Sequence, residues 1–156
     1  MDDLDVVTGD VTSGAVRLAV GGGTAAVPGQ HPGPNGDPVI FEADFPPPMG
    51  GTGSAPNPLA YCFWGGLACY AMTYAQEAAR QGIELRAVRA RTEAEVDQSR
   101  ALGVTENPPV DQIDWHLEID ADAPREKLEE LKQLADDHCP GVWCVRNPVN
   151  LRTHLD

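Results

Sequence analysis

The chain has few basic residues and only two lysines. Lys and Arg together number 11 of the 156 residues, against 24 Asp and Glu, so the formal net charge is −13 at pH 7. A nucleic-acid partner requires clustered Lys and Arg side chains that neutralise phosphates. Because the basic residues here are few and scattered along the chain, the composition argues against binding to nucleic acid.

The chain also lacks a long apolar run. No segment approaches the ~20 consecutive apolar residues that cross a bilayer. Residues 1–5 are acidic, the opposite of the basic start of a secretory signal. We therefore expect no membrane partner and a cytoplasmic location. Without a secretory signal, the four cysteines favour free, catalytic or metal-binding thiols over structural disulfides.

Glycine and proline are abundant but unevenly placed. They concentrate over residues 20–54, where their runs predict turns and an extended loop, because proline fixes φ and glycine permits positive φ. The length of the chain suits one domain with a sizeable core. We expect a single domain over residues 1–156 that includes this Gly/Pro-rich region.

Hydrophobic periodicity predicts an α+β domain in which strands and helices are segregated. Asn57 and Pro58 have the features of a helix start, and Gly82 has those of a helix end. The apolar surface of this long helix predicts burial on several sides, and its small residues let another backbone approach. Residues 76–81, at its end, are polar and are expected to reach solvent.

The expected order of elements is β-β-β-α-β-β-α-β, with the first three strands as an antiparallel meander. Strands are expected over residues 5–10, 15–20, 38–43, 83–96, 110–120 and 149–155, the fourth and fifth forming an antiparallel pair. Helices are expected over residues 57–82 and from Pro124 onward, with Pro140-Gly141 interrupting the second or beginning a fresh turn.

Two cysteines lie on separate predicted elements. Cys69 is inside the long helix, two turns after Cys62 and near the same face, and Cys139 precedes a proline at the end of the second helix. Free cysteines are most often small core hydrophobes, and this interpretation stays open. The alternative is a reactive thiol with a distant partner, which requires the two Cα atoms to lie within about 7 Å.

A reactive thiol needs a nearby cation or a helix N-terminus, because only the thiolate is nucleophilic. Cys69 is in mid-helix, where the helix dipole contributes little. Arg17 and Arg146 are the candidate cations. The ordinary alternative for either residue is a solvent-exposed arginine.

Other chemistries fit the sequence less well. Zinc ligands usually lie two to four residues apart, and neither Cys62 with Cys69 nor Cys139 with Cys144 has that spacing, even with His138 added. No Gly-x-Ser-x-Gly turn follows a strand, as a serine hydrolase would need. The glycine runs lack the lysine and helix of a phosphate-binding loop. We expect no metal and no cofactor.

Aromatic residues crowd the long helix, where they predict core packing or an apolar pocket beside the thiol. They are Tyr61, Phe63, Trp64, Tyr70 and Tyr74.

Three stretches together resemble the OsmC/Ohr superfamily, the osmotically inducible and organic hydroperoxide resistance proteins. The stretches are Asp44-Phe45-Pro46 with Gly50-Gly51 and Pro56-Asn57-Pro58, then GLACYAMT at residues 66–73, then Cys139-Pro140. The resemblance covers about residues 38–156. It implies antiparallel sheets around a long buried central helix, and two protomers that intertwine as a homodimer.

The resemblance also implies a cysteine-based peroxidase that takes part in the oxidative stress response. Cys69 would attack the O–O bond of an organic hydroperoxide and become a sulfenic acid. Cys139 would then condense with it to a disulfide, which a dithiol reductant of lipoyl or thioredoxin type would reduce. Arg17 would be the activating cation.

The sequence departs from the family pattern at the helix start. The peroxidase branches place a glutamate there to hold the catalytic arginine, and this chain has Leu59. Either another acid such as Glu42 or Asp44 takes that part, or peroxidase activity is weak. The second hypothesis is therefore a non-enzymatic OsmC-like protein that binds a small apolar molecule or senses oxidants.

Overall fold

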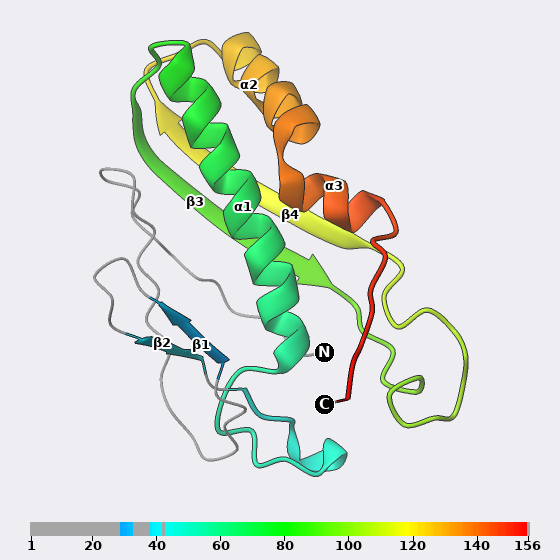
Figure 1. Cartoon of the computed structure of the whole chain (residues 1–156). Coiled ribbons are helices and arrows are strands. Elements are labelled where there is room, and N and C mark those ends of the chain that lie inside the picture. Colours follow the sequence, from blue (N-terminus) through cyan, green and yellow to red (C-terminus); the bar gives the residue numbers. More distant parts are fainter. Residues whose placement is uncertain (1–28, 33–37, 42, 156) are drawn as a thin grey trace. The chain divides into compact units, whose positions relative to one another are not determined.

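The computed structural model describes residues 29–32, 38–41 and 43–155. They fall into two compact units, one within Arg17–Trp64 and one within Gly65–Asp156 (Figure 1). The boundary falls inside the long helix, and each unit is described by itself. The predicted strands at residues 5–10 and 15–20 lie outside the described residues, as do Arg17 and Glu42.

The first unit contains a short hairpin, β1 (Gly29–Pro32) with β2 (Pro38–Phe41), in which Gly29 pairs with Phe41. The expected strand at residues 38–43 is confirmed over four residues. The prediction of loop at residues 29–32 is wrong. These residues have little β propensity, and their strand conformation comes from backbone pairing with β2, which outweighs propensity. The 3-10 helix η1 (Pro47–Met49) follows in the chain.

The long helix α1 (Pro58–Arg80) is confirmed with both its expected ends. The Asn57 Oδ1 atom accepts a hydrogen bond from Leu59 N–H at 2.9 Å, which is an N-cap. At the other end Gly82 has a φ of 69°, while Ile83 N–H donates to Ala78 C=O and Gly82 N–H donates to Ala79 C=O. This pair of bonds is a Schellman motif, which needs the left-handed glycine.

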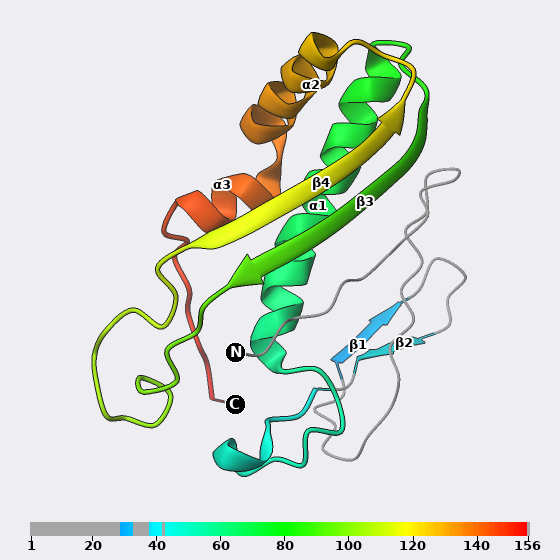
Figure 2. The same ribbon diagram turned by 180° about the vertical axis from the view of Figure 1, so that it is seen from behind.

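The second unit is built on the antiparallel pair β3 (Leu85–Ala94) and β4 (Ile113–Ala121), as expected. The helices α2 (Arg125–His138) and α3 (Pro140–Arg146) complete it. From Gly65 on, α1 lies with α2 and α3 on one face of this strand pair (Figures 1 and 2). On that face the core consists of Tyr70, Tyr74, Ala78, Leu131, Ala135, Cys139 and Val142, with Trp115, Leu117 and Ile119 of β4 packed against them.

The expected solvent-reaching end of α1 is wrong in part. Glu77 and Ala78 are buried, because α2 packs against the last turns of the helix. Burial on several sides is also incomplete within one chain, since Gly65 is exposed and Met72 is 52% exposed. One stripe of α1 therefore faces outward.

The expected closing strand at residues 149–155 is wrong. These residues are exposed and have no strand pairing, and Val149, Leu151 and Leu155 project into solvent. Alternating apolar residues form a strand only where a sheet edge pairs with them. The described order is thus β-β-α-β-β-α-α, apart from η1, because Pro140 begins a separate short helix at its first position. In the part of the chain described, no helix is long and apolar enough to cross a membrane.

Candidate functional site

Cys69 of α1 and Cys139, at the junction of α2 and α3, lie in contact. Their Sγ atoms are 3.6 Å apart, although 70 residues separate them in the chain. Both are free thiols, and Cys139 is only 1% exposed while Cys69 is half-buried. A disulfide bond is about 2.05 Å long, so a small further approach of the two sulfurs would allow one to form.

Pro140 determines the backbone conformation of Cys139, the residue before it. A residue before proline avoids the helical region, and Cys139 accordingly has φ −73° and ψ 117° between two helices. Its N–H donates to Ala135 C=O at 3.0 Å, and its C=O accepts from Trp143 N–H at 3.1 Å. Cys139 thus ends α2 and begins α3 while its side chain enters the core.

Small residues let α3 and β4 approach the Cys69 helix. A Cβ added to Gly141 would lie 3.0 Å from the Cβ and 3.3 Å from the Sγ of Cys69. A Cβ added to Gly66, one turn before Cys69, would lie 2.7 Å from Cζ2 of Trp115. Gly66 of the long helix thus admits a side chain of β4, whereas the close approach of the α3 backbone depends on Gly141 of α3 itself.

Burial raises the pKa of Cys69 above that of an ordinary cysteine. Gly141 N–H opposes this rise, because it is a hydrogen-bond donor to the sulfur, whereas Cys139 and Cys144 add to it. The principal influences on this thiol from the described residues include no arginine or lysine. Arg146 instead lies 3.9 Å from the Asp136 carboxylate. The other candidate cation, Arg17, is outside the described residues.

Asp44, one candidate for the missing acid, closes a loop in the first unit. Its Oδ2 atom accepts hydrogen bonds from the N–H and hydroxyl of both Thr52 and Ser54, at 2.6 to 3.0 Å. These bonds hold the pKa of the Asp44 carboxyl well below its usual range. The carboxylate is therefore engaged within its own loop. The other candidate, Glu42, is not among the described residues.

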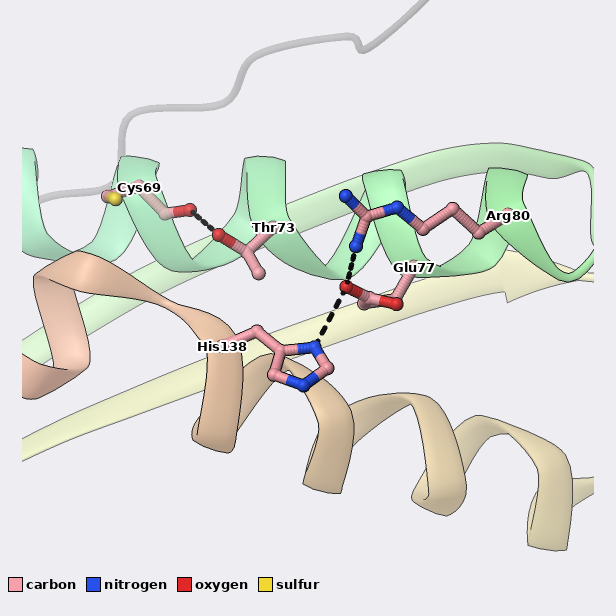
Figure 3. A network of polar contacts seen from close by, with 5 residues as sticks. All are labelled: Cys69, Thr73, Glu77, Arg80 and His138. Atoms are coloured by element: carbon pink, nitrogen blue, oxygen red, sulfur yellow. Dashed lines mark hydrogen bonds and ion pairs between the residues drawn. The ribbon is translucent and has the colours of Figure 1, made fainter.

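A buried carboxylate lies two turns beyond Cys69 on α1 (Figure 3). Glu77 is 4% exposed, and its Oε1 atom is 2.5 Å from Nη1 of Arg80 and 3.1 Å from Nδ1 of His138. The hydrogen bond from His138, with Arg80 in support, lowers the pKa of Glu77 although burial opposes this. Sequence reasoning missed the network. No local sequence pattern indicates it, because His138 is 61 residues away from Glu77 in the chain.

An open hollow of ≈ 450 Å³ lies on the β4 side of this unit, lined by Tyr70, Trp115, Asp136, Val142 and Arg146 among others. The Tyr70 and Trp115 ring centroids are 5.7 Å apart. Burial raises the pKa of Tyr70, and the Asp136 carboxylate that accepts its hydrogen bond adds to this. The lining residues do not include the two cysteines. The hollow is amphipathic rather than apolar.

The two remaining cysteines, Cys62 and Cys144, are exposed. Within residues 29–32, 38–41 and 43–155, no three His, Cys, Asp or Glu side chains are grouped so that they could hold a metal ion. His138, which the sequence offered as a possible ligand, bonds to Glu77.

Two solved structures share the fold. The crystal structure of an OsmC-like protein from Mycoplasma pneumoniae has a TM-score of 0.55 and 17% identity, covering 72% of this chain and 74% of that one. The structure of an organic hydroperoxide resistance protein OsmC from Legionella pneumophila, described as a predicted redox protein and regulator of sulfide bond formation, has a TM-score of 0.53 and 22% identity, covering 72% and 77%. A search of curated proteins gives no match.

The family described as OsmC-like protein matches residues 51–154, which include both cysteines in contact. The match extends over more than half of the chain, and the α+β architecture agrees with it. The chain belongs to the OsmC-like protein family.

Proposed function

We propose that this protein is a thiol-dependent peroxidase that reduces organic hydroperoxides. Cys69 is the nucleophile, and Cys139 is the resolving thiol. The observation that carries the proposal is the 3.6 Å distance between two free thiols that come from distant parts of the chain. A merely structural pair of core cysteines would not require one member to remain partly open to solvent, as Cys69 does.

The chemistry follows in two steps. The Cys69 thiolate attacks the outer oxygen of the hydroperoxide, the O–O bond breaks, and Cys69 becomes a sulfenic acid. The alkoxide that leaves takes a proton from water and departs as the alcohol. The Cys139 sulfur then attacks the Cys69 sulfur. An S–S bond forms, the S–O bond breaks, and water leaves with the proton of the Cys139 thiol.

A dithiol of lipoyl or thioredoxin type would return the protein to its reduced form. Its first thiolate attacks one sulfur of the disulfide, and its second displaces the mixed disulfide, so that two electrons pass to the protein and the dithiol becomes oxidised. Cys69 is the accessible sulfur, because Cys139 is almost fully buried. A cytoplasmic location, where such dithiols are kept reduced, suits this cycle.

Arg17 is proposed as the cation that makes Cys69 a thiolate. The described surroundings of Cys69 raise its pKa, so they do not activate it by themselves. Leu59 stands where the family places the carboxylate that holds the arginine, and Asp44 is engaged elsewhere. We therefore expect a peroxidase whose activating arginine is less firmly held than in the peroxidase branches.

A homodimer is proposed as the working form. In a single chain, Met72 of α1 is 52% exposed and Trp143 of α3 is 60% exposed, with Val145 beside it in sequence half exposed as well. Burial of exposed apolar side chains against a partner is favourable. A second copy of the chain would cover them.

The test is intact-mass analysis after one equivalent of cumene hydroperoxide is added to the reduced protein, with peptide mapping of any bridge. We expect a loss of two hydrogens that maps to Cys69 and Cys139. The Cys69→Ser variant should not consume hydroperoxide, and the Cys139→Ser variant should stop at one sulfenic acid per chain. Full turnover by Cys69→Ser would exclude the assignment.

A second candidate is a non-enzymatic OsmC-like protein that binds a small molecule or senses oxidants. Leu59 favours it, as does the ≈ 450 Å³ hollow whose lining includes Tyr70, Trp115 and Arg146. This candidate predicts saturable binding of a small amphipathic molecule with no consumption of hydroperoxide. Catalytic turnover with a dithiol would exclude it.

A further inference from the structure

Adjacent residues at the end of α2 make polar contacts with α1. His138 Nδ1 lies 3.1 Å from Glu77 Oε1 (Figure 3). The Sγ atom of the next residue, Cys139, lies 3.6 Å from that of Cys69. Two other hydrogen bonds from α1 reach α2: Tyr74 Oη donates to Leu128 C=O near the start of α2, and Tyr70 donates to the Asp136 carboxylate. The Glu77 contact is the one made by the residue that directly precedes Cys139 in the chain.

Apolar packing alone does not fix the last turn of α2 in detail. Leu131 and Ala135 are fully buried and press the helix onto α1, but dispersion and hydrophobic contacts are non-directional and tolerate small rotations and slides. A hydrogen bond to a charged group is directional and roughly twice as strong as a neutral one. The Glu77 contact therefore restrains the residue whose backbone leads directly to Cys139.

The carboxylate is itself held in place. It is 4% exposed and has Arg80 on its own helix and His138 on α2 as its hydrogen-bond partners. Removing a partner of a buried charge costs free energy. The contact between Glu77 of α1 and His138 of α2 therefore opposes separation of the two helices at this point. Arg80 does not bridge the helices, because it comes from α1.

We propose that Glu77 is a positioning residue for the resolving thiol: by holding His138, its carboxylate keeps the Cys139 sulfur within bonding reach of Cys69. The inference rests on the proposed function in so far as Cys139 is the resolving thiol. Glu77 touches neither the substrate nor the reacting sulfurs. It affects how readily the Cys69–Cys139 disulfide forms.

The test is the equilibrium between the dithiol and the Cys69–Cys139 disulfide in buffers of reduced and oxidised glutathione, with the bridge identified by peptide mapping. The ratio of disulfide to dithiol at a known glutathione composition gives the effective concentration of one thiol at the other. In Glu77→Ala and His138→Ala we expect it to fall on the order of tenfold, the scale of one charged hydrogen bond. That fall corresponds to a rise of about 30 mV in the two-electron potential.

Two further variants make the test specific. Arg80→Ala removes the other partner of Glu77 and leaves the bridge to α2, so its potential should stay within about 10 mV of the parent value. Glu77→Gln keeps an oxygen that can accept from His138 and is the milder change if Glu77→Ala does not fold. It should give an intermediate potential. A general loss of stability that affects both redox forms equally would not move the potential.

The outcomes are separable from those of the proposed function. Equal potentials in the parent, Glu77→Ala and His138→Ala proteins would overturn this inference, as would the absence of a Cys69–Cys139 bridge in the parent. The glutathione equilibrium needs no hydroperoxide, so it reports on positioning even in a protein that does not turn over peroxide. Failure of the peroxide test alone would overturn the peroxidase proposal and leave the positioning result standing.

Discussion

Gly141 lies so close to Cys69 that a methyl group at this position would make an unusually tight contact with it. A Cβ at position 141 would come within 3.0 Å of the Cys69 Cβ and 3.3 Å of its Sγ, and within 3.2 Å of the Gly66 carbonyl oxygen. The first turn of α3 therefore forms one wall around the thiol. It also supplies the backbone N–H that opposes the rise in the pKa of Cys69.

The first prediction concerns this contact. Gly141→Ala should push α3 from α1 and cost about 1–3 kcal/mol of unfolding free energy by overpacking, although alanine is the better helix former. Disulfide formation after hydroperoxide should also slow. Urea denaturation and quenched-flow alkylation measure the two effects. Gly65→Ala is the matched control, since a Cβ there meets nothing within 4 Å, and we expect it to stabilise α1 by up to about 1 kcal/mol. Equal behaviour of the two variants would contradict the contact.

The second prediction concerns the activation of Cys69. Below its pKa, a thiol reacts about tenfold faster for each pH unit, since only the thiolate reacts. In Arg17→Ala, no arginine counters the burial that raises the pKa of Cys69, so alkylation at Cys69 should show this full slope from pH 7 to 8. The parent protein should react faster at pH 7 and show a shallower slope. Site-resolved iodoacetamide labelling measures both, with Arg146→Ala as control. Identical profiles for parent and Arg17→Ala would remove Arg17 from the mechanism.

The third prediction concerns acid stability. The pKa of Glu77 is lowered from its ordinary 4.5 by His138 and Arg80. A carboxyl with a lowered folded pKa stabilises the fold above its unfolded pKa, and this contribution is lost as the pH falls through the folded pKa. The unfolding free energy of the parent should thus decline more steeply below pH 4.5 than that of Glu77→Gln. Denaturant titrations between pH 3 and 6 measure the difference. Parallel curves would show that the carboxylate carries no such linkage.

The fourth prediction concerns the exposed thiols. Cys62 and Cys144 are not in the thiol contact, so the double variant Cys62→Ser with Cys144→Ser should form the same Cys69–Cys139 bridge with at least half of the parent's rate. A slight gain in Cys69 reactivity is expected, because Cys144 contributes to the raised pKa of Cys69. Mass mapping and stopped-flow consumption of hydroperoxide measure this. Loss of the bridge in the double variant would show that one of these thiols takes part in the cycle.

Sequence patterns were sufficient where the signal is local. Asn57 and Gly82 limit α1 as predicted, because capping depends on the chemistry of a few adjacent residues. The alternation along β3 and β4 likewise predicted a pair with one buried face. Residues 149–155 show where a local pattern is insufficient, because a strand also needs a partner to pair with. They alternate like a strand, but no described strand pairs with them.

The candidate site was predictable only through resemblance. The sequence alone left Cys69 and Cys139 as two core cysteines or a reactive pair, since the distance between them depends on how α2 packs on α1. Glu77 was out of reach altogether. Its partner His138 is 61 residues away in the chain, and no local pattern indicates that pairing.

The separation of 70 positions between the two contacting thiols means that oxidation would also affect the stability of the fold. A bond at that point would tie the unfolded chain into a loop that holds most of the second unit. By loop-closure entropy, this would disfavour unfolding by about 4 kcal/mol relative to the dithiol. The oxidised molecule would then melt later and resist proteases longer than the reduced one. The resistance of the protein to unfolding would therefore depend on whether it has recently reacted with an oxidant.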